Sequence, residues 1–257
     1  MSRAFPRPAR PPDPMPVWRE RADVETSSEG YARRFAGPVG EYFLETQAAI
    51  LLELLARFPG ARVLDVGGGH AQLAGPLLEK GFEVTVAGSE EVCRARLDRL
   101  LPLGSFEFRA CDLLDLPFPD RSFDVVIAFR LLAHVPRWRE LVAELCRVAD
   151  RAVVVDYSDV RSFNIFYTLL FPWKKKIEGN TRTFLCFKPG EVAAELARHG
   201  FGRAATRREF FVPMVVHRAL SRPRIARGLE RASRFLGLTR AFGSPTVLCA
   251  EREVEHL

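Results

Sequence analysis

The sequence predicts an α/β protein with a doubly wound sheet that carries helices on both faces. Strand-forming runs alternate with helix-periodic segments along most of the 257 residues, as in parallel sheets joined by crossover helices. The first such strand ends in an acidic residue and three consecutive glycines, a turn typical of the ligand-binding edge of such a sheet. Seven strands can be assigned in this way, and the length suits one substantial core.

Composition and charge indicate the domain organisation and the cellular compartment. Residues 1–22 are rich in proline and arginine and predict a disordered tail, which leaves 23–257 as a single domain. The net charge of +6 is concentrated at the ends, and residues 203–240 hold ten arginines against two glutamates. The five cysteines form no C-x-x-C pair and suggest no metal site, and no signal peptide or transmembrane run is visible. We therefore expect a cytoplasmic protein with reduced thiols.

The segment ARVLDVGGGHA, residues 61–71, organises the rest of the chain. Its strand is followed by Gly67, Gly68 and Gly69, which leave no Cβ between the turn and a bound molecule. Such a turn suits a ligand with phosphate or nucleoside groups. A dinucleotide-binding turn needs a third glycine where this chain has Gln72, so NAD binding is disfavoured.

This stretch resembles motif I of the class I S-adenosylmethionine-dependent methyltransferases, hhhD-h-G-x-G-x-G, with Ala71 in place of the last glycine. The resemblance, to the type 11-like group of the family, covers residues 40–252. It implies a Rossmann-like sheet in the order 3-2-1-4-5-7-6 with the last strand antiparallel. It also implies S-adenosyl-L-methionine as the cofactor, with Asp65 and the three glycines among its contacts.

The second strand, 82–87, ends where this family usually has an acidic residue that accepts both ribose hydroxyls of the cofactor. This chain has Gly88 at that position. The resemblance therefore moves the ribose contact to Ser89 or Glu90. The alternative is that Ser89 only caps the next helix and that the ribose is held differently.

The third strand, 106–111, leads into CDLLDLPFPDRSFD, which is similar to the family segment G-D-x-x-x-L-P-F-x-x-x-x-F-D. By this resemblance Asp112 accepts the adenine amino group and the backbone N–H of Leu113 reaches a ring nitrogen. The alternative is that Asp112 only caps a turn. Phe129 and Arg130, which end and follow the next strand, complete the expected cofactor contacts.

A general base is expected near the ends of the fourth and fifth strands, 125–129 and 152–156. After the fourth strand the chain reads RLLAHVPRW, similar to the family's h-x-H-V-P segment. His134 is the first candidate, because imidazole titrates near neutrality. Asp156 and Tyr157 are the other candidates, and a purely structural histidine is the alternative account of His134.

Two segments are expected to close over the ligands. The aromatic and basic residues 157–187 follow the fifth strand and form the expected lid, with Tyr167 and Arg182 as proposed substrate contacts. Residues before the first strand often fold over the cofactor in this family, and Tyr31 is the substrate candidate there. The alternative is that each of these side chains only packs against its neighbours or lies in a solvated loop.

The last two strands are placed at 208–216 and 246–251, with a helical insertion at 220–240 between them. Within it, residues 223–236 form a basic amphipathic helix, with apolar side chains on one side and arginines on the other. We expect the apolar side to cover the core and the arginines to stay in water. Contact with an anionic membrane or with phosphates is the alternative.

The predicted function is transfer of a methyl group from S-adenosyl-L-methionine to a small, partly apolar acceptor by in-line displacement. Two alternatives stay open. The basic C-terminal surface suits an RNA methyltransferase, although the DPPY-type tetrapeptide of nucleic-acid N-methylating enzymes is absent after the fourth strand. The glycine at position 88 suits a non-catalytic relative that only binds the cofactor. The sequence does not specify the acceptor atom.

Overall fold

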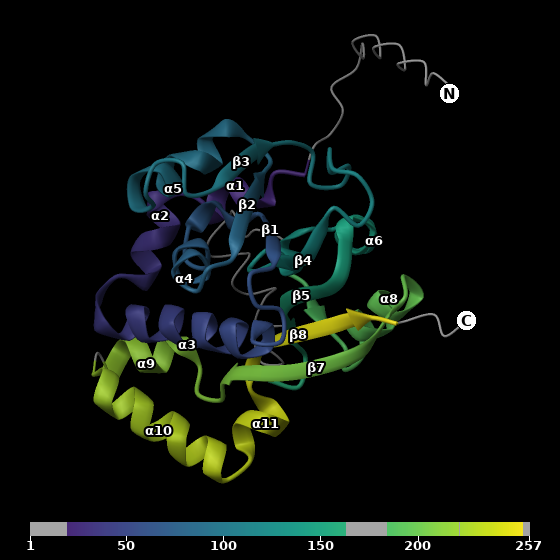
Figure 1. Cartoon of the computed structure of the whole chain (residues 1–257). Helices are drawn as coiled ribbons and strands as arrows, with labels where there is room; N and C mark the ends of the chain where they lie inside the picture. The colour runs from purple at the N-terminus through teal and green to yellow at the C-terminus, as the bar shows by residue number, and fades with distance from the viewer. Residues whose placement is uncertain (1–19, 163–183, 221, 254–257) are drawn as a thin grey trace, which may run out of the picture.

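The computed structural model describes residues 20–162, 184–220 and 222–253 (Figure 1). Residues 1–19 of the expected tail and residues 163–183 of the expected lid lie outside this set, and so do the candidates Tyr167 and Arg182. Residues 20–22 of the expected tail are described, and α1 (Ala22–Thr26) begins there.

The sheet has the predicted class and order. Its strands are β1 (Arg62–Val66), β2 (Glu83–Gly88), β3 (Glu107–Ala110), β4 (Phe123–Ala128), β5 (Ala149–Asp159), β6 (Cys186–Phe187), β7 (Phe201–Phe210) and β8 (Ser244–Arg252). Among the described residues they run in the order β3-β2-β1-β4-β5-β8-β7, with the short β6 paired to β5. β8 is antiparallel to both of its neighbours, so the predicted order 3-2-1-4-5-7-6 is confirmed once β6 is set aside.

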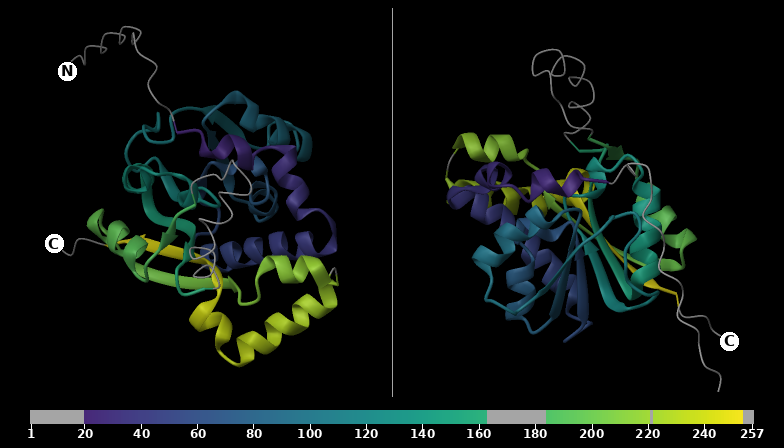
Figure 2. Two further views of the ribbon diagram at one scale, coloured as in Figure 1. Left: turned by 180° about the vertical axis from the view of Figure 1, so that it is seen from behind. Right: turned by 90° about the horizontal axis from the view of Figure 1, so that it is seen from above.

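Helices cover both faces of this sheet (Figure 2). The α-helices after α1 are α2 (Glu29–Ala32), α3 (Gly37–Leu55), α4 (Ala74–Glu79), α5 (Ala95–Leu100), α6 (Trp138–Val148), α8 (Glu191–Arg198), α9 (Met214–Leu220), α10 (Pro223–Phe235) and α11 (Leu238–Phe242). The 3-10 turns are η1 (Arg33–Phe35), η2 (Gly68–His70), η3 (Glu91–Arg94) and η4 (Leu132–His134). No helix in the described part of the chain combines the length and apolarity needed to cross a membrane.

The core consists of two apolar layers, one on each side of the sheet. α6 and α8 pack on one face, and α3, α4 and α5 pack on the other. Val126 belongs to the first layer and Val125 to the second, because successive side chains of a strand point to opposite faces. This arrangement explains why the central strands read as continuous apolar runs.

The predicted position of the sixth strand, 208–216, is wrong. The strand that occupies this place is β7, and it ends at Phe210. β7 is the edge of the sheet, and most of its middle residues are exposed or half-buried, so it lacks the apolar run that marks a buried strand. The apolar residues at and after the end of β7 make other contacts. The Phe210 ring lies 4.9 Å from that of Phe43 on α3, and Met214 begins α9.

The predicted orientation of the basic helix is also wrong. α10 has the expected bounds to within one residue, but Ile225 and Leu229, on the side expected to cover the core, are 40% and 39% exposed. The side of α10 that faces the protein holds the buried residues Ala226, Glu230 and Ser233. The apolar side of this helix therefore contributes to the surface.

A buried carboxylate explains this orientation. Glu230 is 1% exposed and accepts hydrogen bonds from the backbone N–H groups of Phe211 and Val212, both at 3.0 Å. Its Oε1 atom also lies 2.9 Å from Nε2 of His217 on α9. Burying a carboxylate without such partners would be costly, so these contacts select the side of α10 that packs inward.

Candidate functional site

The glycine turn lies at the carboxyl edge of the sheet, directly after β1. Gly67 has a φ of 77°, a left-handed conformation that favours glycine, and its N–H donates to the carbonyl of Ala87 at 2.8 Å. η2 then carries the chain to Ala71, which has a φ of 65°. Two of the three glycines, Gly68 and Gly69, thus lie within the 3-10 turn itself, and α4 begins only at Ala74.

The next two glycines allow close approaches on both sides of the turn. A Cβ atom at Gly68 would lie 2.2 Å from Oδ2 of Asp65, and one at Gly69 would lie 2.2 Å from Oγ of Ser27. Neither distance is compatible with a side chain. The glycines therefore let the Asp65 carboxyl fold against the turn and let the end of α1 rest on it.

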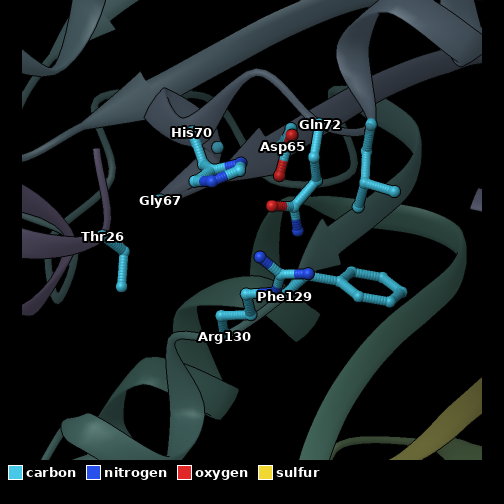
Figure 3. Close-up of a pocket in the computed structure, with 9 residues that line it drawn as sticks. Thr26, Asp65, Gly67, His70, Gln72, Phe129 and Arg130 are labelled. Atoms are coloured by element: carbon cyan, nitrogen blue, oxygen red, sulfur yellow. The ribbon is translucent and has the colours of Figure 1, made fainter. Parts of the chain in front are cut away.

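A narrow cavity lies beside the turn (Figure 3). Its lining residues are Thr26, Asp65, Gly67, Gly68, His70, Gln72, Leu73, Phe129 and Arg130, and five of them are expected cofactor contacts. Its volume is about 10 Å³, the space of about one water molecule. The side chains around the turn thus form a closed arrangement.

Burial shifts the titration of two side chains in this cavity. Asp65 is 2% exposed, and loss of water around the charged form raises the pKa of its carboxyl to about 7. Burial, with the positive charges of Arg130 and Arg96, lowers the pKa of His70 to about 3. At neutral pH the His70 ring is therefore uncharged, whereas Asp65 titrates close to neutrality.

Arg130 places a cation in the cavity. Its backbone has a φ of 57°, and its N–H donates to Oδ1 of Asp156 at 2.6 Å. The guanidinium lies 4.0 Å from the ring centroid of Phe35, and Figure 3 shows the side chain extended toward those of Gln72 and Asp65. One of its terminal nitrogens is buried without a hydrogen-bond partner among the described residues.

A buried polar network next to the cavity was missed by the sequence analysis. Nε2 of Gln47 on α3 donates to Oδ2 of Asp156 at 3.2 Å and to Oε1 of Glu209 at 2.8 Å, and Nε2 of Gln72 donates to Oε1 of Gln47 at 2.8 Å. Burial raises the pKa of Asp156 to about 6; burial, together with the Asp156 charge, raises that of Glu209 to about 8. The available sequence signal was Gln47, a polar residue among the buried positions of α3.

The end of β2 has no room for the acidic residue that the family usually carries there. A Cβ atom at Gly88 would lie 2.9 Å from Cβ of Cys93 and from Cζ of Phe108. Asp23 of α1 brings a carboxylate to this place instead: it is fully buried, and its Oδ2 accepts a hydrogen bond from the backbone N–H of Ser89 at 2.8 Å. No local pattern marks Asp23, because its partner lies 66 positions along the chain.

The two residues proposed for the ribose have different surroundings. Ser89 is 3% exposed, and its Oγ has no hydrogen-bond partner in the described part of the chain. Glu90 is engaged in an ion pair with Arg21, and both side chains are accessible to water. Ser89 therefore keeps a buried hydroxyl with unused hydrogen-bonding capacity, whereas Glu90 already has a cationic partner.

Asp112 and Leu113 follow β3, which is the neighbour of β2 in the sheet. Oδ1 of Asp112 accepts a hydrogen bond from the backbone N–H of Leu114 at 3.0 Å, so this carboxylate does cap a turn. Leu113 is fully buried in the same apolar layer as Ala22 of α1.

The expected bases His134 and Tyr157 do not line the cavity. The His134 ring, in η4, lies 5.6 Å from that of Phe184. Tyr157 is 6% exposed with its ring 5.6 Å from that of Phe187, and burial raises its pKa. Asp156 is nearer to the cavity through its hydrogen bond to Arg130.

Tyr31 lies at the edge of the cavity. Its ring centroid is 5.7 Å from those of Phe35 and His70, and the latter residue lines the cavity. These three rings and the guanidinium of Arg130 form one packed group. Tyr31 therefore contacts cavity residues, and packing accounts for its position.

Buried polar atoms without a partner gather around the glycine turn. Among the described residues, six such side-chain atoms are Oδ1 of Asp23, Nδ1 and Nε2 of His70, Oε1 of Gln72, Oγ of Ser89 and a terminal nitrogen of Arg130. Buried polar groups normally have hydrogen-bond partners, so a cluster of this kind indicates a site for a polar ligand.

Comparison with known proteins matches this site to one domain family. The family model of a methyltransferase domain matches residues 64–153. The chain is 35% identical over 105 residues to the O-methyltransferase cnsE of Penicillium expansum, covering 38% of each chain. It is 29% identical over 128 residues to the ubiquinone/menaquinone biosynthesis C-methyltransferase UbiE of Paraburkholderia phymatum, covering 45% of this chain and 53% of that protein. The chain thus spans about half, or less, of these relatives.

Solved structures share the fold over most of the chain. Magnesium protoporphyrin IX methyltransferase from Synechocystis PCC 6803, with bound S-adenosylmethionine, has a TM-score of 0.58 at 19% identity, covering 90% of this chain and 97% of that one. The [4+2]-cyclase SpnF has a TM-score of 0.56 at 19% identity, covering 81% and 80%. Since the two proteins are named for different reactions, the likeness concerns the fold.

Proposed function

We propose that this chain, a class I S-adenosylmethionine-dependent methyltransferase by its fold and by residues 64–153, transfers a methyl group to a small, partly apolar acceptor. The observation that carries the proposal is the cluster of unpartnered buried polar atoms around the glycine turn. The cluster offers a cation from Arg130, a carboxylate from Asp23 and a hydroxyl from Ser89, and Asp23 lies next to Gly67 of the turn. This set suits a ligand that has both amino-acid and ribose groups.

The side chains on and around the glycine turn have the charges and hydrogen-bonding groups that the cofactor requires. We assign Asp65 to its ammonium group and Arg130 to its carboxylate, because charged hydrogen bonds of this type are the strong ones. Asp23 is assigned to the ribose hydroxyls, since its free Oδ1 can accept a bond while Oδ2 stays on the backbone. Asp112 and Leu113 keep their expected roles toward the adenine.

The cavity must widen before a nucleoside-sized ligand can enter, because its present volume is about that of one water molecule. Thr26 lines the cavity and Ser27 rests on Gly69, so the carboxyl-terminal end of α1 is the part that has to move away. We expect the remainder of the site, on β1 and β4, to keep its place, because those strands lie in the centre of the sheet.

When bound, S-adenosylmethionine supplies a methyl group on a positively charged sulfur. The protein has to orient the acceptor and, for a hydroxyl or an acidic carbon, remove a proton. The named activities of the relatives, O- and C-methylation, both belong to this class. We keep His134 as the proposed base and assign Asp156 a positioning role, because its two oxygens already hold the backbone of Arg130 and the amide of Gln47.

Calorimetric titration of the protein with S-adenosylmethionine and with S-adenosylhomocysteine tests the cofactor assignment. We expect saturable binding of both, weakened by Asp65→Asn and by Arg130→Gln. Absence of binding by protein freed of any co-purified nucleoside would refute the proposal. An Asp98→Asn variant, altered at an exposed carboxylate on α5, is the matched control and should bind like the wild type.

The competing function is cofactor binding without methyl transfer. It stays open because β2 ends at Gly88, where the structure has no room for the acidic residue that the family usually carries. Incubation with radiolabelled S-adenosylmethionine and a panel of phenols, catechols and hydroquinones separates the two functions. Labelled product together with S-adenosylhomocysteine supports methyl transfer, and its reduction in His134→Gln, with an altered pH profile, supports the base. Tight binding with no product from any acceptor favours the competing function.

A further inference from the structure

The whole segment between β7 and β8, residues 211–243 and here called the α9–α11 insertion, exposes many apolar side chains. Seven of the ten large hydrophobic residues that are exposed in the described part of the chain fall within residues 216–242. Phe235 is 90% exposed and Leu236 67%, and Ile225 and Leu229 continue the same surface at 40% and 39%. Isolated exposed apolar residues are ordinary on a protein surface, but a contiguous set marks an interaction site.

The exposed charge of the segment between β7 and β8 is positive. Residues 211–243 contain seven arginines, and their one acidic residue is Glu230, which is buried and hydrogen-bonded inside the protein. Arg224 and Arg231, which are exposed on α10 beside the apolar side chains, form no ion pair within the described residues. On the flank toward α3, Arg227 is paired with Glu45 at 3.1 Å. The apolar surface is thus bordered by unneutralised positive charge.

The position of the insertion relates it to the candidate site. β8 begins opposite the carboxyl end of β5, where Thr246 pairs with Tyr157, so the insertion stands at the same sheet edge as the glycine turn. The guanidinium of Arg218 on α9 lies 5.7 Å from the ring centroid of Phe35, whose ring also contacts His70 of the cavity. Figure 1 shows α10 at the outer edge of the molecule, with α9 and α11 at its two ends.

We propose that the α9–α11 insertion docks on an anionic lipid surface, with Phe235, Leu236, Ile225 and Leu229 in the headgroup region and Arg224 and Arg231 on lipid phosphates. A helix with a polar face rich in arginine and an exposed apolar face binds at such an interface, through buried apolar area and attraction to negative lipids. A nucleic acid would contact the arginines but would leave the apolar side chains of Leu236 and Ile225 exposed to water.

Sedimentation with vesicles tests the docking. We expect the wild type to bind vesicles of phosphatidylcholine mixed with phosphatidylglycerol, and not vesicles of phosphatidylcholine alone. The Phe235→Ser/Leu236→Ser variant should lose about tenfold or more in affinity, because it removes two large apolar groups from the interface. Arg224→Gln/Arg231→Gln should lose roughly tenfold or more, and should abolish most of the salt dependence.

Leu103→Ser is the matched control. Leu103 is 97% exposed, but it lies between α5 and β3, far in sequence from the segment between β7 and β8. This variant should therefore bind vesicles like the wild type. All altered side chains are exposed, and unchanged thermal midpoints would show that the variants fold.

Several results would overturn the docking: no sedimentation with anionic vesicles at low salt, equal binding by the Phe235→Ser/Leu236→Ser variant, or a dimer that this variant dissociates. Binding to RNA that depends on Arg224 and Arg231 but is unchanged by Phe235→Ser/Leu236→Ser, with no vesicle binding, would do the same. The docking does not rest on methyl transfer. If the protein binds the cofactor but not the vesicles, only the docking is refuted. If it binds the vesicles but not the cofactor, only the proposed function is refuted.

Discussion

The carboxylate of Asp23 on α1 accepts a hydrogen bond from the backbone N–H of Ser89 at 2.8 Å, although Ser89, directly after β2, is 66 positions away in the chain. This contact brings a buried negative group to the end of β2, where Gly88 leaves the strand without one. Oδ1 of the same carboxylate has no partner among the described residues. Asp23 is therefore the acceptor best placed to replace the missing acidic residue of the strand.

Asp23→Asn should weaken binding of S-adenosylhomocysteine by about 10- to 100-fold, because hydrogen bonds to charged groups contribute roughly 1.5–3 kcal/mol. Calorimetry with S-adenosylhomocysteine and with its 2′-deoxy and 3′-deoxy analogues provides the measurement. Loss of a hydroxyl should reduce the affinity of the wild type and have little effect in Asp23→Asn. Glu25→Gln, at an exposed carboxylate on the same helix, should behave as the wild type.

The opposite result has a clear meaning. If Asp23→Asn binds the cofactor more tightly, the carboxylate only holds α1 closed over the turn. Equal sensitivity of both proteins to the deoxy analogues would also contradict a ribose contact.

Gly88→Asp should not restore the affinity that Asp23→Asn loses. A side chain at position 88 meets Cys93 and Phe108 at 2.9 Å, and such overpacking costs about 1–3 kcal/mol of unfolding free energy. Denaturant unfolding of Gly88→Ala measures this cost. Gly75→Ala in α4 is the control, because its Cβ would contact only Leu101, at 3.5 Å, and alanine favours a helix. A harmless Gly88→Ala would show that the end of β2 is not tightly packed.

Ala71→Gly should stabilise the protein by about 0.5–1 kcal/mol. Ala71 has a φ of 65°, a conformation that costs a residue with a Cβ atom roughly 1–2 kcal/mol, and the flexibility of glycine in the unfolded chain offsets part of the gain. The same exchange at the exposed Ala194, within α8, should cost about 1 kcal/mol. Thermal or denaturant unfolding of both variants decides the matter, and a destabilised Ala71→Gly would speak against strain at this turn.

The stability of the protein should fall as the pH rises from about 6.5 to 8. A glutamate in the unfolded chain loses its proton near pH 4.5, whereas Glu209 in the folded protein has a pKa raised to about 8 and keeps its proton until then. The folded state therefore holds more protons in this range, and a higher pH favours unfolding. Asp65, with a pKa of about 7, acts in the same direction, and His70 is uncharged in both states above its unfolded pKa of 6.5.

Glu209→Gln should flatten this pH dependence, and should be at least about 1 kcal/mol more stable than the wild type at pH 8, because it has no proton to lose. Its amide oxygen can still accept the hydrogen bond from Gln47. Chemical unfolding at several pH values compares the two slopes. Parallel curves for the two proteins would mean that Glu209 does not carry the effect.

Local patterns were sufficient for most of the fold. The strand before the glycines and the alternation of strands and helices could be recognised because each is encoded in the periodicity of nearby residues. The strand predicted at 208–216 lies at Phe201–Phe210 in the structure, because an edge strand such as β7 does not need apolar residues on both faces and so lacks the pattern of a buried strand. The orientation of α10 was missed because Glu230, and not the apolar side chains, anchors this helix.

The sequence by itself determined the doubly wound sheet, the glycine turn at its edge and the family resemblance, since strand and turn propensities act over a few neighbouring residues. Only the tertiary structure decided that Asp23 stands at the end of β2, that Gln47 joins Asp156 to Glu209, and that the apolar side of α10 faces outward. Each of these facts depends on contacts between segments far apart in the chain, and burial of a polar group, which no local pattern records, selects each one.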